Sequence, residues 1–162
     1  MDTRTRYRTR VRRIASRLMT ARDWRTASGS TWTPKPCPSD VSAIARKLVG
    51  LANAVPPAHW VTYGDLAEAA GMGEAKNAAR GAASALSFFP LHTPMAEWVL
   101  PWHRIRLENG HLKSRERGVI VDPRDPANEL FIAEGGRLIG GAAPQGRRYP
   151  LTAKVRSGAI TL

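Results

Sequence analysis

The chain has 162 residues, of which 43% are hydrophobic, and it carries a formal net charge of +12 at pH 7. This length suits one domain with a real core and some additional chain. No apolar run reaches the roughly 18 residues of a membrane helix, and none resembles a secretory signal, so we expect no membrane partner. The single cysteine cannot form an internal disulfide, so a reducing, cytoplasmic setting is expected. One cysteine and four scattered histidines do not form a zinc site, so neither a metal nor a cofactor is expected.

The positive charge is concentrated at the two ends of the chain. Residues 1–35 hold nine arginines and Lys35 against two acids, a net charge of +8, and residues 137–162 hold five basic residues and no acid. Basic arms of this kind usually bind nucleic acid. The alternative is that residues 1–35 are a disordered extension with no specific role, or upstream sequence from a misassigned start. A proline-rich stretch over residues 33–38 reads as a linker, so residues 1–38 are predicted to be a flexible basic arm and linker.

The first predicted helix lies within residues 39–55. Ser39 or Asp40 offers an N-terminal cap, and apolar residues recur beyond it at helical spacing. A Pro-Pro pair ends this helix, and residues 59–61 are predicted to form a short extended piece.

Two more helices are predicted, with a tight turn between them. Thr62 with Asp65 three residues later is typical of a capping box, and Gly71 closes the short helix that follows. A longer helix within residues 74–89 then ends before Pro90. Short helix, glycine-containing turn and helix is the order of a helix-turn-helix motif, in which the last of these helices reads DNA.

The longer helix combines one long cation with small side chains. Arg80 is followed by Gly81 and Ala82, and then by Ser84. A helix of small residues either packs tightly against its neighbours or lies close to a DNA backbone. Arg80 is accordingly either a solvated surface residue or a DNA contact, and the residues alone leave both interpretations open.

The stretch LPWHRIRLENG covers residues 100–110. A Pro-x-His-Arg sequence with a nucleophile at x would be typical of an active site, but here x is Trp102, whose indole is not a nucleophile. Short strands are expected at residues 98–100 and 104–107.

Three motifs, VPPAHWVTYGDLAEAAG, NAARGAASAL and LPWHRIRLENGHL, together resemble the DNA-binding domain of the O6-alkylguanine-DNA alkyltransferases. The resemblance covers roughly residues 41–136. Repair-active members have Pro-Cys-His-Arg in the last motif, and their cysteine takes the alkyl group from guanine. Tryptophan at this position is the mark of the alkyltransferase-like proteins, which bind alkylated guanine without repairing it.

The resemblance implies a mainly α fold with short strands, a winged-helix-like helix-turn-helix domain of the alkyltransferase C-terminal type. We place this domain at residues 39–139 and expect residues 140–162 to be a flexible basic tail. The resemblance also has departures. The segment before Arg80 is longer than in many relatives, so the register of Arg80 stays open. Pro94 stands where many members have an asparagine, and residues 112–125 lack the tyrosine that relatives place over the alkyl group, so the size of the pocket stays open.

The resemblance further implies how DNA is bound. An alkylated base must leave the stack to be inspected, so it is flipped into a pocket. Arg80 would fill the gap in the stack and Tyr63 would pack against the rotated phosphate, although a ring in the core is an equally good interpretation of Tyr63. The predicted DNA-binding residues are Tyr63, Arg80, Gly81, Ala82 and Ser84. The predicted lesion-pocket residues are Val99, Leu100, Pro101, Trp102, His103 and Arg104.

No catalytic residue is expected. His103 and Glu134 resemble the remaining members of the family's proton relay, but Trp102 offers them no thiol to activate. Cys37 lies among prolines with no adjacent base.

The implied function is non-catalytic binding of O6-alkylguanine in double-stranded DNA by a monomer, cytoplasmic and nucleoid-associated, which flags lesions for nucleotide excision repair proteins. Two alternatives remain. One is a general helix-turn-helix protein with no lesion preference, and the other is a residual alkyltransferase that works through His103 and Glu134.

Overall fold

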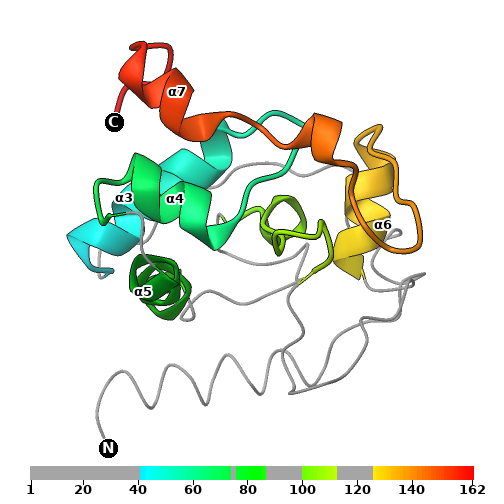
Figure 1. Ribbon diagram of the computed structural model, residues 1–162, viewed down its shortest axis with the longest axis horizontal. Coiled ribbons are helices and arrows are strands. Elements are labelled where there is room, and N and C mark those ends of the chain that lie inside the picture. Colours follow the sequence, from blue (N-terminus) through cyan, green and yellow to red (C-terminus); the bar gives the residue numbers. More distant parts are fainter. Residues whose placement is uncertain (1–40, 74–75, 87–99, 113–125) are drawn as a thin grey trace, which may run out of the picture.

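The computed structural model describes residues 41–73, 76–86, 100–112 and 126–162. Within these ranges the helices are α3 (Ala43–Ala54), α4 (Tyr63–Ala69), α5 (Lys76–Leu86), α6 (Pro126–Ala133) and α7 (Leu151–Arg156), with 3-10 turns η1 (Trp102–Arg104) and η2 (Gln145–Arg147). In Figure 1, α3, α4 and α5 gather at one end, α6 lies at the other, and η1 lies between them. The mainly helical fold is confirmed. No helix among the described residues is long and apolar enough to cross a membrane.

The helix α3 begins later than expected. Ser42 caps it, because its side-chain oxygen accepts a hydrogen bond from the backbone N–H of Ala45 at 3.2 Å. Neither Ser39 nor Asp40 is therefore the cap. The reason is local: Ala43 is the first helical residue, and a cap must lie within one turn of the amide it satisfies.

The short helix α4 begins with the capping box that the sequence predicts. The Thr62 side chain accepts from the Asp65 N–H at 3.0 Å, and the Asp65 carboxylate accepts from the Thr62 N–H at 2.9 Å. Gly71, with a φ of 77°, follows the end of the helix, as expected for a residue in the left-handed region. These contacts fix Tyr63 as the first residue of α4.

Extended pairing among the described residues is limited to isolated bridges. Val61 pairs with Ile105, and Trp60 pairs with Arg148, both in parallel orientation. The predicted strands at 59–61 and 104–107 are thus present only as bridge residues, and Leu100 belongs to no strand, while residues 98–99 lie outside the described part. The Val61–Ile105 bridge matters for the site, because it joins the residues before α4 to those after η1.

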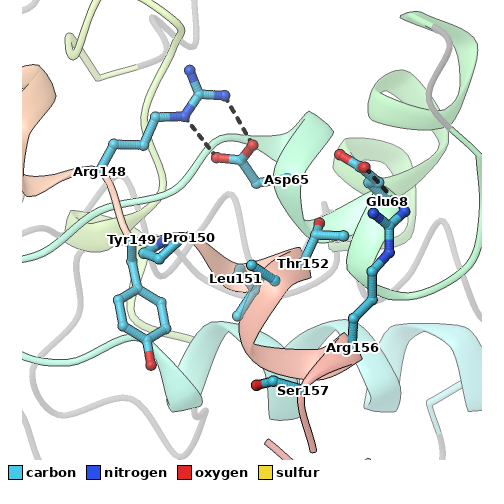
Figure 2. A pocket seen from close by; sticks show the side chains of 10 residues that line it. Asp65, Glu68, Arg148, Tyr149, Pro150, Leu151, Thr152, Arg156 and Ser157 are labelled. Carbon is cyan, nitrogen blue, oxygen red and sulfur yellow. Dashed lines mark hydrogen bonds and ion pairs between the residues drawn. The ribbon is translucent and has the colours of Figure 1, made fainter. Parts of the chain in front are cut away.

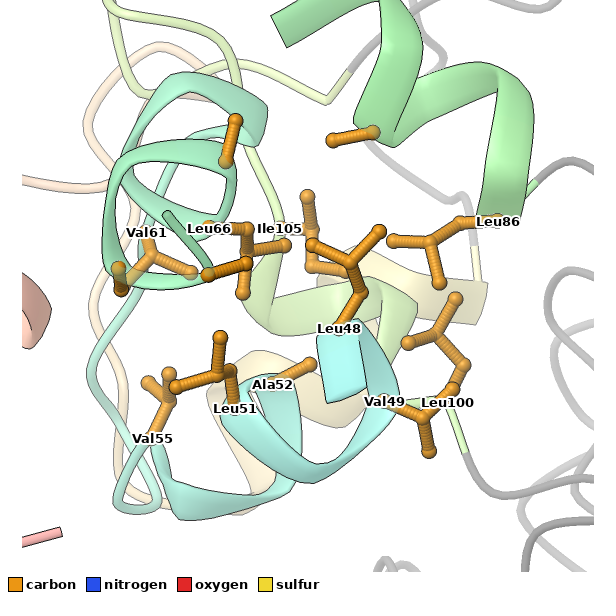
Figure 3. Packing of buried hydrophobic residues seen from close by; sticks show 14 of the residues in the cluster. Leu48, Val49, Leu51, Ala52, Val55, Val61, Leu66, Leu86, Leu100 and Ile105 are labelled. Atoms are coloured by element: carbon orange, nitrogen blue, oxygen red, sulfur yellow. The ribbon is translucent and has the colours of Figure 1, made fainter. Parts of the chain in front are cut away.

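The main core lies between the helices and η1. Figure 3 shows leucine, valine and alanine side chains of α3 meeting Leu66 of α4, Leu86 of α5, and Leu100 and Ile105 on either side of η1. Trp102 belongs to the same cluster. A second, smaller cluster holds Trp60, Phe131 and Ala143, with Leu138 packed against it.

Residues 140–162, expected to form a tail outside the domain, include η2 and α7 and pack on the core. Leu151 is 1% exposed and belongs to the main cluster, and Ala143 belongs to the second. The Trp60 indole N–H donates to the Pro144 carbonyl at 2.9 Å. The expectation was based on the basic composition of this segment. It overlooked the apolar residues, which at helical spacing are enough to attach a short helix.

The helix α7 contacts α4 across an open hollow that is lined mainly by residues 148–157 (Figure 2). An ion pair between Arg148 and Asp65 lies at one end of this hollow. The pair between Arg156 and Glu68, at 3.7 Å, lies elsewhere on its rim and involves a largely exposed arginine. None of the predicted lesion-pocket residues lines this hollow, so it is separate from the candidate site.

Candidate nucleic-acid interface

The tight turn η1 directs three consecutive side chains inward. The Trp102 N–H donates to the Leu100 carbonyl and the Arg104 N–H donates to the Pro101 carbonyl, each at 2.9 Å. All five residues from Leu100 to Arg104 are buried, and Trp102 is 8% exposed. Val99, the remaining predicted pocket residue, lies outside the described residues. The five described residues of the predicted pocket therefore form one buried segment.

Two aromatic side chains from distant parts of the sequence meet at this segment. The ring centroids of Tyr63 and Trp102 are 6.3 Å apart, with an interplanar angle of 59°. Tyr63 is half-buried and packs against the main core. The bridge between Val61 and Ile105 brings the two residues together, because Val61 lies just before Tyr63 and Ile105 just after η1. Tyr63 therefore contacts the core and also adjoins the predicted pocket, so its position is compatible with a core role and with a DNA-binding role.

The predicted relay remnants are also in contact. His103 Nε2 lies 2.7 Å from Glu134 Oε1, and both side chains are buried. The Arg104 guanidinium binds the same carboxylate through two nitrogens, and its third nitrogen donates to the Val55 carbonyl at 2.8 Å. Glu134 lies directly after α6 and so links that helix to η1. The sharing of this carboxylate with Arg104 was not predicted.

Burial and pairing set the charges of this cluster. Burial has the largest influence on His103 and lowers its pKa below the ordinary value of 6.5. Burial alone would raise the pKa of Glu134, but hydrogen bonds from His103 and Arg104 bring it down to about 2. At neutral pH the carboxylate is ionised and can only accept, so the neutral imidazole donates its Nε2–H to Glu134.

Acidification is expected to destabilise the fold from about pH 6.5 downward. The unfolded chain binds a proton at His103 more readily than the folded chain, because folding lowers that pKa. This group alone contributes a limiting slope of about 1.4 kcal/mol per pH unit. Glu134 adds to the loss as the pH falls from 4.5 toward about 2.

Urea unfolding at several pH values between 7.5 and 5.5 measures this slope. In His103→Gln the amide still donates to Glu134 but does not titrate, so its free energy of unfolding should depend less on pH over this range. Equal slopes for the two proteins would show that His103 is not the group responsible.

Two residues that support this cluster were not predicted. Ala58 has a positive φ of 62°, a strained conformation for a residue other than glycine, and its N–H donates to Glu134 at 3.4 Å. Arg106 is fully buried and donates to the His103 carbonyl at 3.2 Å and to Asn128 Oδ1 at 3.1 Å. Its guanidinium lies 4.5 Å from the centre of the Phe131 ring. Arginine is rarely buried completely, so an isolated sequence offers little signal for such a role.

The exposed face of α5 carries hydrogen-bond donors. Its exposed residues are Lys76, Asn77, Arg80 and Ser84. They recur at helical spacing, and α5 contains no acidic residue. The predicted DNA contacts Arg80 and Ser84 therefore lie together on a surface suited to a phosphate backbone.

Two other predicted contacts on α5 lie elsewhere. Ala82 is 0% exposed and belongs to the main core, so its side chain is unavailable to DNA. It is two residues after Arg80, about 200° around the helix, and so lies on the opposite face. Gly81 is half-buried, and a Cβ there would lie 3.2 Å from Met72 Cε, so this glycine allows α5 to approach the preceding turn closely.

The fold and the site define a small helical DNA-binding domain. The family model of the 6-O-methylguanine DNA methyltransferase DNA-binding domain matches residues 43–124, just over half of the chain. The chain belongs to this family, and DNA is its partner. Comparisons with curated proteins and with solved structures find no match.

Proposed function

We propose that this protein binds O6-alkylguanine in double-stranded DNA, with the damaged base flipped out of the stack, and that it does not transfer the alkyl group. Family membership supports DNA as the partner. The lesion and the absence of chemistry are inferred from the site.

The observation that carries the proposal is the position of Trp102. It stands between Pro101 and His103, where repair-active relatives have the acceptor cysteine. The His103–Glu134 pair lies directly beside it, but an indole has no thiol for a base to activate. The single cysteine, Cys37, lies outside the described residues, and the residues on either side of it are prolines.

An aromatic pair at this position suits a flipped base. Stacking of a base on an aromatic side chain contributes about 1–3 kcal/mol. Trp102 adjoins Tyr63, so a flipped guanine would meet the indole while Tyr63 packs against the rotated phosphate. Trp102 is 8% exposed, so the base would enter as neighbouring side chains move aside.

The docking mode follows from α4 and α5. We infer a winged-helix-like helix-turn-helix arrangement in which the exposed face of α5 follows the DNA and Arg80 fills the gap left by the flipped base. Because the bound lesion is not repaired, the protein would flag it for nucleotide excision repair proteins. It would act as a monomer in the cytoplasm, associated with the nucleoid.

Matched duplexes containing guanine or O6-methylguanine test this function at fixed salt. We expect the wild-type protein to bind the lesion duplex at least about tenfold more tightly, the ratio that ~1.4 kcal/mol of differential binding gives. Intact-mass analysis after incubation should show no added methyl group. Equal affinities would instead indicate a general DNA-binding protein, and a stable added methyl group would indicate an alkyltransferase.

The variant Arg80→Ala sharpens the same experiment. We expect lesion binding to weaken by about 1–3 kcal/mol, because the flipped state loses the side chain that fills the stack. Lys76→Ala is the matched control, since it removes one exposed cation from the same face of α5. Loss of a phosphate contact at position 76 should weaken binding to both duplexes alike. An unchanged lesion preference in Arg80→Ala would exclude Arg80 from the flipping step.

A further inference from the structure

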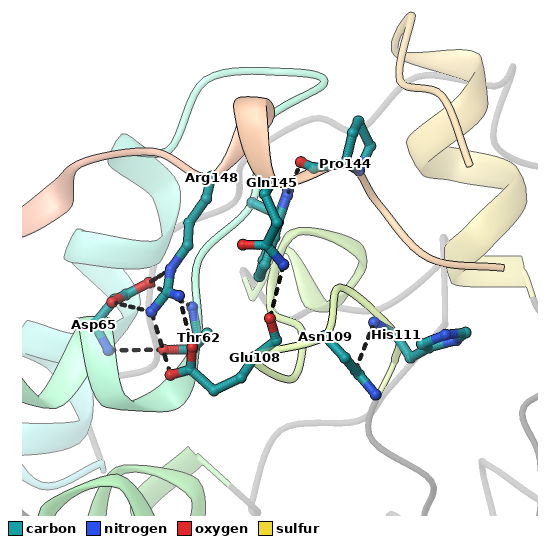
Figure 4. A network of polar contacts seen from close by, with 9 residues as sticks. Thr62, Asp65, Glu108, Asn109, His111, Pro144, Gln145 and Arg148 are labelled. Carbon is teal, nitrogen blue, oxygen red and sulfur yellow. Dashed lines mark hydrogen bonds and ion pairs between the residues drawn. The ribbon is translucent and has the colours of Figure 1, made fainter. Parts of the chain in front are cut away.

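Arg148 joins two acidic residues from separate parts of the chain (Figure 4). Its guanidinium donates to both carboxylate oxygens of Asp65, at 2.9 and 2.8 Å. It also donates to both oxygens of Glu108, at 2.6 and 3.2 Å. Two-pronged binding of this kind fixes geometry as well as charge, because the planar guanidinium fork matches a carboxylate.

The two carboxylates belong to the segments that carry the aromatic pair. Asp65 completes the capping box of α4, two residues after Tyr63. Glu108 lies in the turn that follows η1, six residues after Trp102. The Val61–Ile105 bridge joins the chain before α4 to the chain after η1. Arg148 joins the same two segments a second time, through Asp65 and Glu108.

The chain around Arg148 is itself anchored. The Trp60 N–H donates to the Arg147 carbonyl at 3.1 Å, and the Tyr149 N–H donates to the Trp60 carbonyl at 2.8 Å. The guanidinium lies 5.7 Å from the centre of the Trp60 ring. The side chain is 30% exposed, which separates this network from an isolated surface ion pair.

We propose that Arg148 is a positioning residue for the lesion site: it holds the start of α4 against the turn after η1 and so keeps Tyr63 against Trp102. The inference rests on the proposed lesion binding. It gives the C-terminal segment, which lies beyond the matched family domain, a role in distinguishing damaged from normal DNA.

Paired variants at neighbouring positions test this role. Arg148→Ala and Arg147→Ala each remove one positive charge, but Arg147 is exposed and its backbone contact survives the substitution. We expect Arg148→Ala to lower the ratio of lesion to normal affinity about fivefold, the scale typical of residues that act through others. Arg147→Ala should leave the ratio unchanged. Arg148→Lys should not restore it, because an ammonium group cannot bind both carboxylates in the same geometry.

Glu108→Ala provides a test that does not depend on the stability of Arg148→Ala. Glu108 has a largely exposed side chain, and its removal breaks only one arm of the network. Loss of a negative charge should strengthen binding to any DNA by electrostatics alone. Electrostatics alone would leave the ratio of lesion to normal affinity unchanged. Positioning predicts that this ratio falls.

The outcomes separate this inference from the proposed function. If the wild-type protein binds both duplexes equally, the proposed function fails and the inference fails with it. If the wild-type protein discriminates and both Arg148→Ala and Glu108→Ala discriminate equally well, only the inference fails. If Arg147→Ala lowered the ratio of lesion to normal affinity as much as Arg148→Ala, the effect would come from charge alone. That result would also overturn the inference. Should Arg148→Ala not fold, the Glu108→Ala ratio decides.

Discussion

Removal of residues 140–162 is expected to unfold the domain. Leu151 fills the main core, and loss of a buried leucine side chain costs about 2–5 kcal/mol. The truncation also removes Ala143 from the second core cluster and the carbonyl that accepts the Trp60 indole N–H. Together these losses approach the 5–15 kcal/mol that stabilises a typical domain.

Circular dichroism and thermal unfolding of the truncated chain measure this effect. Removal of Thr161 and Leu162 alone is the control, because both residues are exposed. Leu151→Ala in the full chain should lower the free energy of unfolding by about 2–5 kcal/mol without removing any other contact. A truncated chain with the unfolding midpoint of the full chain would show that the segment contributes no stability.

The variant Glu134→Ala is expected to lose about 3–5 kcal/mol of stability. It removes the carboxylate that pairs with Arg104 and His103, and so leaves a buried cation without its partner. The Ala58 N–H loses the same acceptor. Glu134→Gln should be less severe, because one amide oxygen can still accept a hydrogen bond.

Denaturant unfolding of the two variants tests this ranking. Where either variant is folded, we expect its ratio of lesion to normal affinity to fall, because Glu134 holds His103 and Arg104 of η1 and so supports Trp102 between Pro101 and His103. Wild-type stability in Glu134→Ala would contradict the buried pairing. An unchanged ratio in a folded Glu134→Ala would show that this cluster does not position Trp102 for lesion binding.

Part of the candidate site could be predicted from the sequence. The positions of Trp102 and His103 follow from a short motif, and the contact between His103 and Glu134 was expected from the family resemblance. The exposed position of Arg80 is compatible with its predicted role as a DNA contact, which stays a prediction. The basic arm over residues 1–38 lies outside the described residues, as does Val99, and both remain predictions.

The sequence by itself determined the local features of this protein. Three features follow from patterns within one or two helical turns: the capping box of Thr62 and Asp65, the turn at Gly71 after α4, and the order of α3, α4 and α5. Such patterns are legible because a cap or an amphipathic face depends on residues three or four positions apart.

Only the tertiary structure decided which residues are buried and which distant partners they meet. Ala82 packs into the core, Arg106 is buried against Phe131, and Arg148 joins carboxylates 83 and 40 positions away in the chain. No local pattern predicts these outcomes. An arginine is expected to be exposed unless it is paired, and its partners here come from distant parts of the chain. The packing of residues 140–162 has the same origin. The charge of this segment is typical of a solvated tail, but its apolar side chains, including Leu151 and Ala143, pack into core clusters formed by the rest of the chain.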